Sequence, residues 1–218
     1  MTSKPIILVA GDPDSIFFEI FFKSLKHKRF NSPIILIASI RLLKSQLKKF
    51  NFKKKIRLIN LKNLKEFKID NKNINIINVN YITNKSYQNN LINVNSYINK
   101  CFEIAFEILK SKFTNKLING PINKDNFLKK KFLGVTEYIS TKFKINKNAM
   151  LIFNKSLSVC PLTTHLPLKL VSKKISKKLI IEKIILINKF YKVNFSIKPK
   201  IAVTGLNPHC ESIHKYNE

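Results

Sequence analysis

Short aliphatic runs alternate with longer segments of mixed polarity along the first part of the chain. The short runs are Pro5–Ala10, Pro33–Ala38 and Lys55–Asn60, and the longer segments are Ser15–Lys28 and Ile40–Phe50. The short runs have the length and β-branched content of buried strands, whereas the longer segments are typical of helices. Asp14 or Ser15 is placed to cap the first helix. This repeated strand-then-helix order predicts an α/β layered fold with a mainly parallel sheet.

The pattern is less regular in the rest of the chain. Asn71–Asn90 is rich in Asn and Ile, and we expect a loop and an edge strand there. Leu91–Lys112 carries apolar side chains at helical spacing and predicts a long helix. The remaining predicted elements are strands at Lys116–Ile118 and Pro199–Thr204, helices at Glu137–Phe143 and Lys177–Tyr191, and a hairpin joining Met150–Phe153 to Leu157–Cys160.

Four polar motifs directly follow predicted strands. They are GDP after Ala10, NGPINK after Ile118, TTHLP after Leu162 and GLNPH after Thr204. In open α/β sheets, ligands bind outside the carboxyl ends of the strands. The sequence therefore predicts that the four motifs converge on one rim.

The chain is strongly basic, with a net charge of +29 from 41 Lys and Arg against 12 Asp and Glu. Such a charge is typical of nucleic-acid-binding proteins. Only three of the basic residues are arginines, however, whereas phosphate and base readers favour the bidentate guanidinium. A/T-rich codons explain the abundance of Lys, Ile and Asn more simply. Nucleic acid is therefore the alternative partner, not the expected one.

The cysteines and the apolar runs indicate the cellular compartment of the protein. An odd, sparse set of Cys101, Cys160 and Cys210 forms no disulfide framework and suits a reducing compartment. The first apolar run, Ile6–Ala10, is too short for the core of a signal peptide. Charged residues interrupt every long apolar stretch, so no membrane span fits. We expect a cytoplasmic protein.

Two histidines are candidate metal ligands. His165 and His209 each follow a predicted strand closely and lie beside a proline, which gives a loop a rigid shape. Two neutral imidazoles hold Zn²⁺ or a similar ion when a third ligand joins them. Two hydrogen-bonded loop histidines are the simpler alternative. A mixed site with Cys160 and Cys210 is disfavoured, because adjacent His209 and Cys210 side chains tend to point apart.

Two segments have features of anion sites. Gly120–Lys124 is a glycine turn that leads into a helix start and carries a lysine. In Gly134–Glu137, the Thr136 hydroxyl lies near a helix N-terminus, where a phosphate is stabilised. A plain strand-to-helix turn at the first segment and an N-cap role for Thr136 are the alternatives. Neither GxGxxG nor a Walker motif is present, so the usual nucleotide fingerprints do not apply.

Taken in order, five blocks resemble the 4-hydroxythreonine-4-phosphate dehydrogenase family. The blocks are Val9–Pro13 (VAGDP), Gly120–Lys124 (GPINK), Gly134–Tyr138 (GVTEY), Thr163–Leu168 (TTHLPL) and Gly205–His209 (GLNPH). The fourth and fifth blocks are the most specific, and the resemblance spans the whole chain in order and approximate spacing.

The resemblance implies an activity and a set of site residues. His165 and His209 match two ligands of a divalent metal (Zn, Mg or Co), and Thr136 matches a position that contacts the substrate phosphate. The family oxidises the C3 hydroxyl of 4-phosphooxy-L-threonine with NAD. Decarboxylation then gives 3-amino-2-oxopropyl phosphate for pyridoxal 5'-phosphate synthesis. A metal on the hydroxyl stabilises the alkoxide and orients the C–H bond for hydride loss.

The resemblance also implies the fold and the assembly. The family is homodimeric, with an active site at the subunit interface, and its fold is a three-layer α/β/α arrangement of the isocitrate-dehydrogenase type. On this basis, residues 1–135 form the first α/β domain and residues 136–218 begin a second one.

Three departures from the family pattern affect these expectations. Val135 stands where the family has a His, which leaves open oxidation of a related 4-phosphorylated hydroxy acid. Asp14–Phe17 replaces a glycine-rich opening after the GDP block. The chain ends at Glu218, before the family's third metal ligand and most NAD contacts. We therefore expect a fragment of the enzyme, and a non-catalytic remnant is the alternative.

Overall fold

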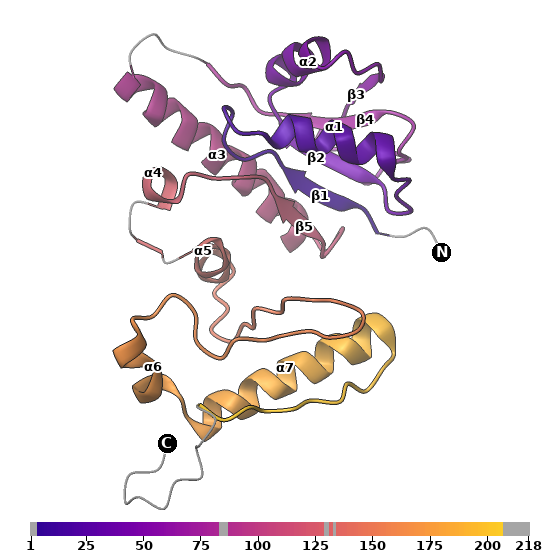
Figure 1. Cartoon of the computed structure of the whole chain (residues 1–218). Coiled ribbons are helices and arrows are strands. Elements are labelled where there is room, and N and C mark those ends of the chain that lie inside the picture. Colours follow the sequence, from indigo (N-terminus) through magenta and orange to yellow (C-terminus); the bar gives the residue numbers. More distant parts are fainter. Residues whose placement is uncertain (1–3, 83–86, 129–130, 133, 207–218) are drawn as a thin grey trace, which may run out of the picture. The chain divides into compact units, whose positions relative to one another are not determined.

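The computed structural model describes residues 4–82, 87–128, 131–132 and 134–206. The chain divides into two compact units, Met1–Lys129 and Lys130–Glu218 (Figure 1). The division into domains 1–135 and 136–218 stays a prediction. Within the described residues, no helix is both long enough and apolar enough to cross a membrane.

The first unit contains a five-stranded parallel sheet with the strand order β3-β4-β2-β1-β5. Its strands are β1 (Ile6–Val9), β2 (Ile34–Ala38), β3 (Ile56–Leu58), β4 (Ile74–Asn78) and β5 (Leu117–Asn119). Its helices are α1 (Phe17–His27), α2 (Ile40–Lys49), α3 (Tyr87–Lys110) and α4 (Lys124–Leu128). The predicted α/β fold with a parallel sheet is confirmed.

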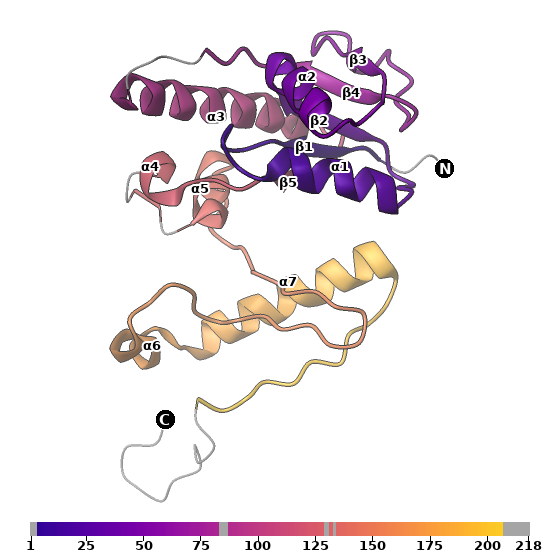
Figure 2. The same cartoon turned by 45° about the horizontal axis from the view of Figure 1, so that its top comes forward.

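The order of the strands explains how the helices cover the sheet. The chain moves from β1 to β2 to β3 in one direction, and it returns from β4 to β5 in the other. Because crossovers between parallel strands are right-handed, α1 and α2 lie on one face and α3 on the opposite face (Figures 1 and 2). The first unit therefore has three layers.

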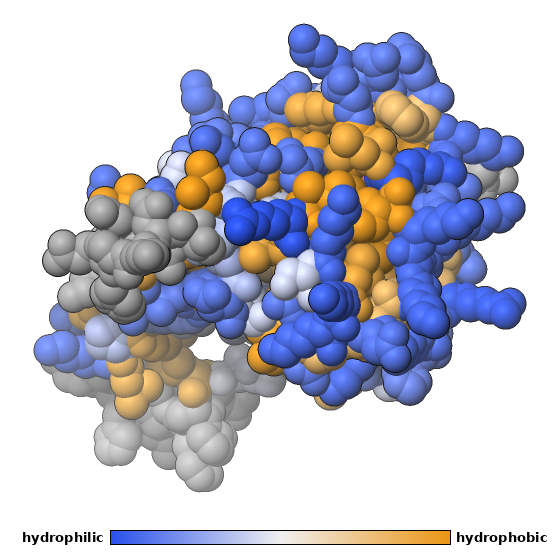
Figure 3. Space-filling view, turned by 90° about the horizontal axis from the view of Figure 1, so that it is seen from above, coloured by the Kyte–Doolittle hydropathy of each residue, from blue (hydrophilic) through white to orange (hydrophobic). Residues whose placement is uncertain are grey.

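Aromatic side chains of α1 fill the core on one face of the sheet. Phe17, Phe18, Phe21 and Phe22 are buried there against strand residues such as Leu36. On the other face, the helix α3 buries a second set of side chains that includes Tyr97, Cys101 and Phe102. Burial of strands on both faces explains why they are continuous aliphatic runs without polar alternation. Some apolar surface remains on the face seen in Figure 3, where it is bordered by hydrophilic side chains.

The Asn-rich segment contains an inner strand, so the predicted edge strand is wrong. The strand β4 pairs with β3 on one side and β2 on the other, and Ile74–Ile77 is buried. Asn75 is tolerated there because its side-chain nitrogen donates to the carbonyl oxygens of Ile34 and Asp70, over 3.1 and 2.5 Å. Its side-chain oxygen is buried without a partner among the described residues, so the two donated bonds offset only part of the cost of burial.

The predicted cap of the first helix is also wrong. The N-cap of α1 is Ile16, whose side chain makes no capping bond, although the Ser15 hydroxyl accepts from the Phe17 amide over 3.4 Å. The polar side chains close the preceding turn instead, because the Ser15 hydroxyl donates to the Asp12 carbonyl oxygen and the Asp14 amide donates to the Asp12 carboxylate. By contrast, Ser39 caps α2 by accepting from the Leu42 amide at 3.4 Å.

The second unit consists of α5 (Val135–Lys142), α6 (Leu168–Lys174), α7 (Lys177–Phe195) and extended segments. The predicted hairpin is reduced to a single antiparallel bridge between Ile152 and Val159. The predicted strand at 199–204 is wrong, because this segment is extended without pairing to another strand in the described part of the chain. Of the unit's described residues, only Gly134 and Tyr138 are buried.

Candidate active site

The first two of the four motifs meet at the carboxyl end of the sheet, and the convergence of all four stays a prediction. β1 and β5 are neighbours, and the Gly120 amide donates to the Val9 carbonyl oxygen over 2.7 Å. Beyond the strands, the Asp12 amide donates to the Pro121 carbonyl oxygen over 2.8 Å. The GDP and GPINK loops therefore form one rim.

Two glycines make this close approach between the loops. Gly11 has a φ of +78°, and a Cβ atom there would lie 2.3 Å from the Pro121 carbonyl oxygen. A Cβ atom on Gly120 would lie 2.2 Å from the Ala10 carbonyl oxygen. Both distances are impossible for a real side chain, so these positions exclude every other residue without movement of the backbone.

The anion site predicted at Gly120–Lys124 stays a prediction. Asn123 accepts a hydrogen bond from the Asn126 amide over 3.1 Å and so closes the turn into α4. Lys124 is exposed at the first position of that helix. The Lys124 side chain therefore lies in solvent at the end of the GPINK loop and does not pack in the core.

The sequence did not indicate a hollow of about 410 Å³ in the first unit. Asn78, Val79 and Asn80 line it from the carboxyl end of β4, and Lys100, Glu103, Ile104 and Glu107 line it from α3. The Asn78 side-chain oxygen already accepts from the Ile40 amide over 2.8 Å. The sequence could not single out Asn78 and Asn80, because the same segment contains many other asparagines.

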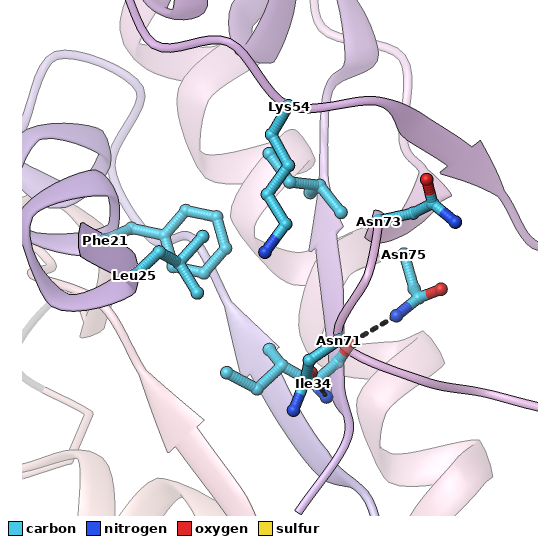
Figure 4. Close-up of a pocket in the computed structure, with 8 residues that line it drawn as sticks. Phe21, Leu25, Ile34, Lys54, Asn71, Asn73 and Asn75 are labelled. Atoms are coloured by element: carbon cyan, nitrogen blue, oxygen red, sulfur yellow. Dashed lines mark hydrogen bonds between the residues drawn. The ribbon is translucent and has the colours of Figure 1, made fainter. Parts of the chain in front are cut away.

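A smaller cavity lies at the opposite, amino end of the sheet. It has a volume of about 10 Å³, which is room for roughly one water molecule. Figure 4 shows the Lys54 side chain extending toward Phe21 and Leu25, and the Asn75 amide bonded to Ile34. Its size and its distance along the strands from the rim separate it from the candidate active site.

In the second unit, α5 begins at the GVTE motif. Its N-cap is Gly134, which is extended and buried, and no side chain of that residue caps the helix. Thr136 is the second helical residue and is exposed, so the alternative reading of Thr136 as an N-cap is wrong. The Thr136 hydroxyl and the first amides of α5 are available to an anion, which the positive end of a helix favours.

His165 lies beside the start of α5. A Cβ atom built on Gly134 would be 3.8 Å from His165 Nε2 and 2.9 Å from Glu137 Oε2. The TTHLP and GVTE motifs are far apart in sequence, and the fold brings them together. Sequence reasoning missed Glu137, although a Glu three residues after a helix N-cap is a recognisable spacing.

The backbone of His165 is strained. Its φ is 56°, in the left-handed region that non-glycine residues rarely adopt, and its side chain is exposed. Pro167, the N-cap of α6, follows two residues later. Strained residues that persist in a fold are concentrated at functional sites. The loop therefore presents the imidazole at a cost in stability.

The residues present are compatible with part of a metal site. His165 nitrogen and Glu137 oxygen are donor types that Zn²⁺ and related ions accept. Within the described ranges, no three His, Cys, Asp or Glu residues are grouped closely enough to hold an ion. His209, the other predicted ligand, lies outside the described residues.

The cysteines of the described part are not placed for catalysis. Burial raises the pKa of the Cys101 thiol to about 12, so it stays protonated at neutral pH. Cys160 is half-buried, and its sulfur is 3.9 Å from the Pro161 carbonyl oxygen. Both are free thiols.

The family model described as "Pyridoxal phosphate biosynthetic protein PdxA" matches residues 29–214. The chain belongs to the PdxA family. The resemblance noted from the five sequence blocks is thereby confirmed.

Two curated relatives illustrate the match. The 4-hydroxythreonine-4-phosphate dehydrogenase of Sulfurihydrogenibium sp. is 32% identical over 212 residues, which cover 94% of this chain and 63% of the relative. The enzyme of the same name from Aquifex aeolicus is 28% identical over 215 residues, which cover 95% of this chain and 64% of the relative. The PdxA chain thus spans just under two thirds of the length of these relatives.

Solved structures agree on the fold. A putative 4-hydroxythreonine-4-phosphate dehydrogenase from Salmonella typhimurium has a TM-score of 0.81 at 22% identity, with 99% of this chain and 67% of that chain covered. The Klebsiella pneumoniae enzyme has a TM-score of 0.78 at 22% identity, with coverages of 95% and 64%. The α/β fold of this PdxA chain is therefore shared with both.

Proposed function

We propose that this PdxA chain belongs to an enzyme that oxidises 4-phosphooxy-L-threonine with NAD. Decarboxylation of the product gives 3-amino-2-oxopropyl phosphate for pyridoxal 5'-phosphate biosynthesis. The observation that carries the proposal is the approach of His165 to the start of α5, where Thr136 lies. This arrangement supports the proposal, because a residue type that can bind a metal lies near a helix start that could bind a phosphate.

In this proposal, Thr136 and the N-terminal amides of α5 bind the substrate phosphate. Charge-assisted hydrogen bonds from a helix start suit a dianionic group. His165 holds a divalent ion (Zn, Mg or Co) together with His209. When bound, the metal acts as a Lewis acid toward the hydroxyl that is oxidised. The left-handed backbone of His165 is consistent with a loop shaped to present this residue.

The cofactor, the assembly and the location are further parts of the proposal. NAD is the expected hydride acceptor, and the absence of GxGxxG from the sequence fits a dehydrogenase that does not use a Rossmann domain. We expect a homodimer with a shared active site, in the cytoplasm.

The substrate is the part of the proposal most open to variation. Val135 is the first residue of α5 and is half-buried, next to Thr136. A valine cannot donate the hydrogen bond that an imidazole at this position offers. A related 4-phosphorylated hydroxy acid is therefore the second candidate substrate.

The distribution of lysines gives no support to a nucleic-acid role. Exposed lysines occur on α1, α2, α3 and α7 alike, for example Lys23, Lys44, Lys100 and Lys177. A dedicated phosphate-binding surface gathers its cations on one face. The net charge is better explained by codon composition.

Turnover with the two substrate classes tests the proposal. NADH formation is measured with 4-phosphooxy-L-threonine and with a 4-phosphorylated hydroxy acid, for the full-length wild-type protein and for its His165→Ala and Thr136→Val variants. We expect His165→Ala to abolish turnover, and Thr136→Val to raise KM for the phosphorylated substrate. Thr141→Val is the matched control, because the Thr141 hydroxyl bonds only within α5, to the Glu137 carbonyl oxygen. Undiminished turnover in His165→Ala would contradict the assignment, and no turnover in the wild-type protein would favour the non-catalytic alternative.

A further inference from the structure

The Glu137 carboxylate and the His165 imidazole approach the same point beside the Gly134 backbone. The two distances of 2.9 and 3.8 Å are measured from one point, the Cβ position of Gly134. Glu137 Oε2 and His165 Nε2 are therefore separated by no more than the sum of these distances. A side chain at position 134 would crowd the carboxylate of Glu137, whereas the distance to His165 would be an ordinary contact.

Glu137 is one of several acids that form no ion pair within the described residues of this basic chain. The acids that do form one there are Glu19, Asp70 and Glu182. In the same unit, Glu182 pairs with Lys147 at 3.5 Å. Among the described residues, by contrast, no ion pair involves Glu137. Its charge is left to act on the space beside His165.

We propose that Glu137 is a positioning residue of the divalent-cation site formed at His165. The inference rests on the proposed metal role of His165 and adds a residue to it. A carboxylate next to a ligand imidazole orients the ring, raises its basicity and adds negative charge near the ion. Loss of such a partner weakens metal binding about 10- to 100-fold. The half-buried position of Glu137 limits screening of that charge by solvent.

A purely structural role for Glu137 makes a different prediction. A glutamate at the third helical residue can accept a hydrogen bond from the N-cap amide and so stabilise the start of the helix. Glutamine keeps this acceptor and removes the charge. Glu137→Gln therefore preserves a capping role and eliminates a role in cation binding.

Co²⁺ binding to the full-length protein, followed by its visible absorption, separates these roles without any enzyme assay. The variants are Glu137→Gln and His165→Ala, with Glu182→Gln as the control that removes a paired acid in the same unit. We expect His165→Ala to lose Co²⁺ binding and Glu137→Gln to bind about tenfold or more weakly, at an unchanged melting temperature. Glu182→Gln should bind as the wild-type protein does.

The outcomes distinguish the inference from the proposed function. Wild-type affinity in Glu137→Gln, with binding lost in His165→Ala, overturns the role of Glu137 and leaves the metal role of His165 intact. Absence of Co²⁺ binding in the wild-type protein overturns both. Gly134→Ala is a second variant that keeps the charge but moves the carboxylate, because its methyl group would lie 2.9 Å from Glu137 Oε2. It should also bind Co²⁺ more weakly, and unchanged binding in it would overturn the inference.

Discussion

The Gly11 α-carbon lies so close to the Pro121 carbonyl oxygen that no side chain fits between them. The separation from an added Cβ atom would be 2.3 Å, and the adjacent Asp12 amide donates to the same oxygen over 2.8 Å. One carbonyl group thus holds the GDP loop against the GPINK loop.

Gly11→Ala should destabilise the first unit by about 3 kcal/mol, because the left-handed backbone and the contact with Pro121 are both unfavourable for alanine. Urea unfolding measures the change. Lys112→Gly is the control. Lys112 has a left-handed backbone with a φ of 59°, and glycine adopts this conformation without strain. It should be neutral or slightly stabilising. A Gly11→Ala protein as stable as the wild type would show that the two loops separate easily.

Tyr97→Phe should lower the free energy of unfolding by about 2 kcal/mol. The buried Tyr97 hydroxyl oxygen accepts a hydrogen bond from the Ser39 amide over 3.0 Å, and phenylalanine leaves that buried amide without an acceptor. Chemical denaturation of the two proteins tests this. Tyr191→Phe is the matched control, because the Tyr191 hydroxyl bonds to the Ser158 side chain, which is partly exposed to water. Equal effects of the two variants would refute the special role of Tyr97.

Stability should decline in alkaline solution because of Cys101. Burial raises the pKa of its thiol from its ordinary value of 9.0 to about 12, although the hydrogen bond with Tyr97 partly opposes this. Above pH 9 the unfolded chain releases the proton while the folded chain retains it. The stabilisation is therefore complete below about pH 9 and is lost as the pH rises toward about 12.

The Cys101→Ala variant isolates this contribution. The free energy of unfolding, measured between about pH 8 and about pH 10, should fall less steeply in the variant than in the wild type. Site-resolved thiol labelling provides a second readout, in which Cys160 reacts and Cys101 stays protected until the protein unfolds. Identical pH slopes in the two proteins would argue against a raised pKa.

His165→Gly should gain stability and lose function. Glycine relieves the left-handed backbone at φ 56°, which should raise the free energy of unfolding by roughly 0.5–1 kcal/mol. Removal of the imidazole should abolish Co²⁺ binding. Lys144→Gly is the control in the same unit, because Lys144 has a φ of 54° and should gain stability with no change in Co²⁺ binding. A destabilised His165→Gly protein would indicate that the ring supports the fold.

The aliphatic runs predicted four of the five strands of the first unit within a few residues. Continuous burial explains the signal at β1 and β2, whereas β3 and β5 lie at the sheet edges and are partly exposed. The fifth strand, β4, was placed at an edge because INIIN looks like compositional bias. Only the pairing of Asn75 with two backbone carbonyl groups, which is a tertiary relationship, explains its central position. The strand predicted at 199–204 is wrong for the converse reason. The segment is extended, but a strand forms only where another strand pairs with it.

The candidate site was predicted in part. Thr136 and His165 were predicted through family motifs, the local pattern alone left each of them with a simpler alternative, and their roles stay predictions. Glu137 could be proposed only from the fold, because the proposal depends on the proximity of a loop that is distant in sequence. The start of α1 shows the same limit on a small scale. Asp12 and Ser15 form a turn just before Ile16, and the sequence pattern did not predict this turn.

The place of β1 between β2 and β5 has a consequence for the order of assembly. During synthesis, β1 can pair with β2 as soon as that neighbour emerges, but its other edge stays open until β5 is made. The Thr114 hydroxyl, which donates to the Pro5 carbonyl oxygen, closes a long stretch of chain. We expect the GDP loop to take its final shape only at this late step, when Pro121 arrives. The earliest motif to be translated is thus among the last to become ordered.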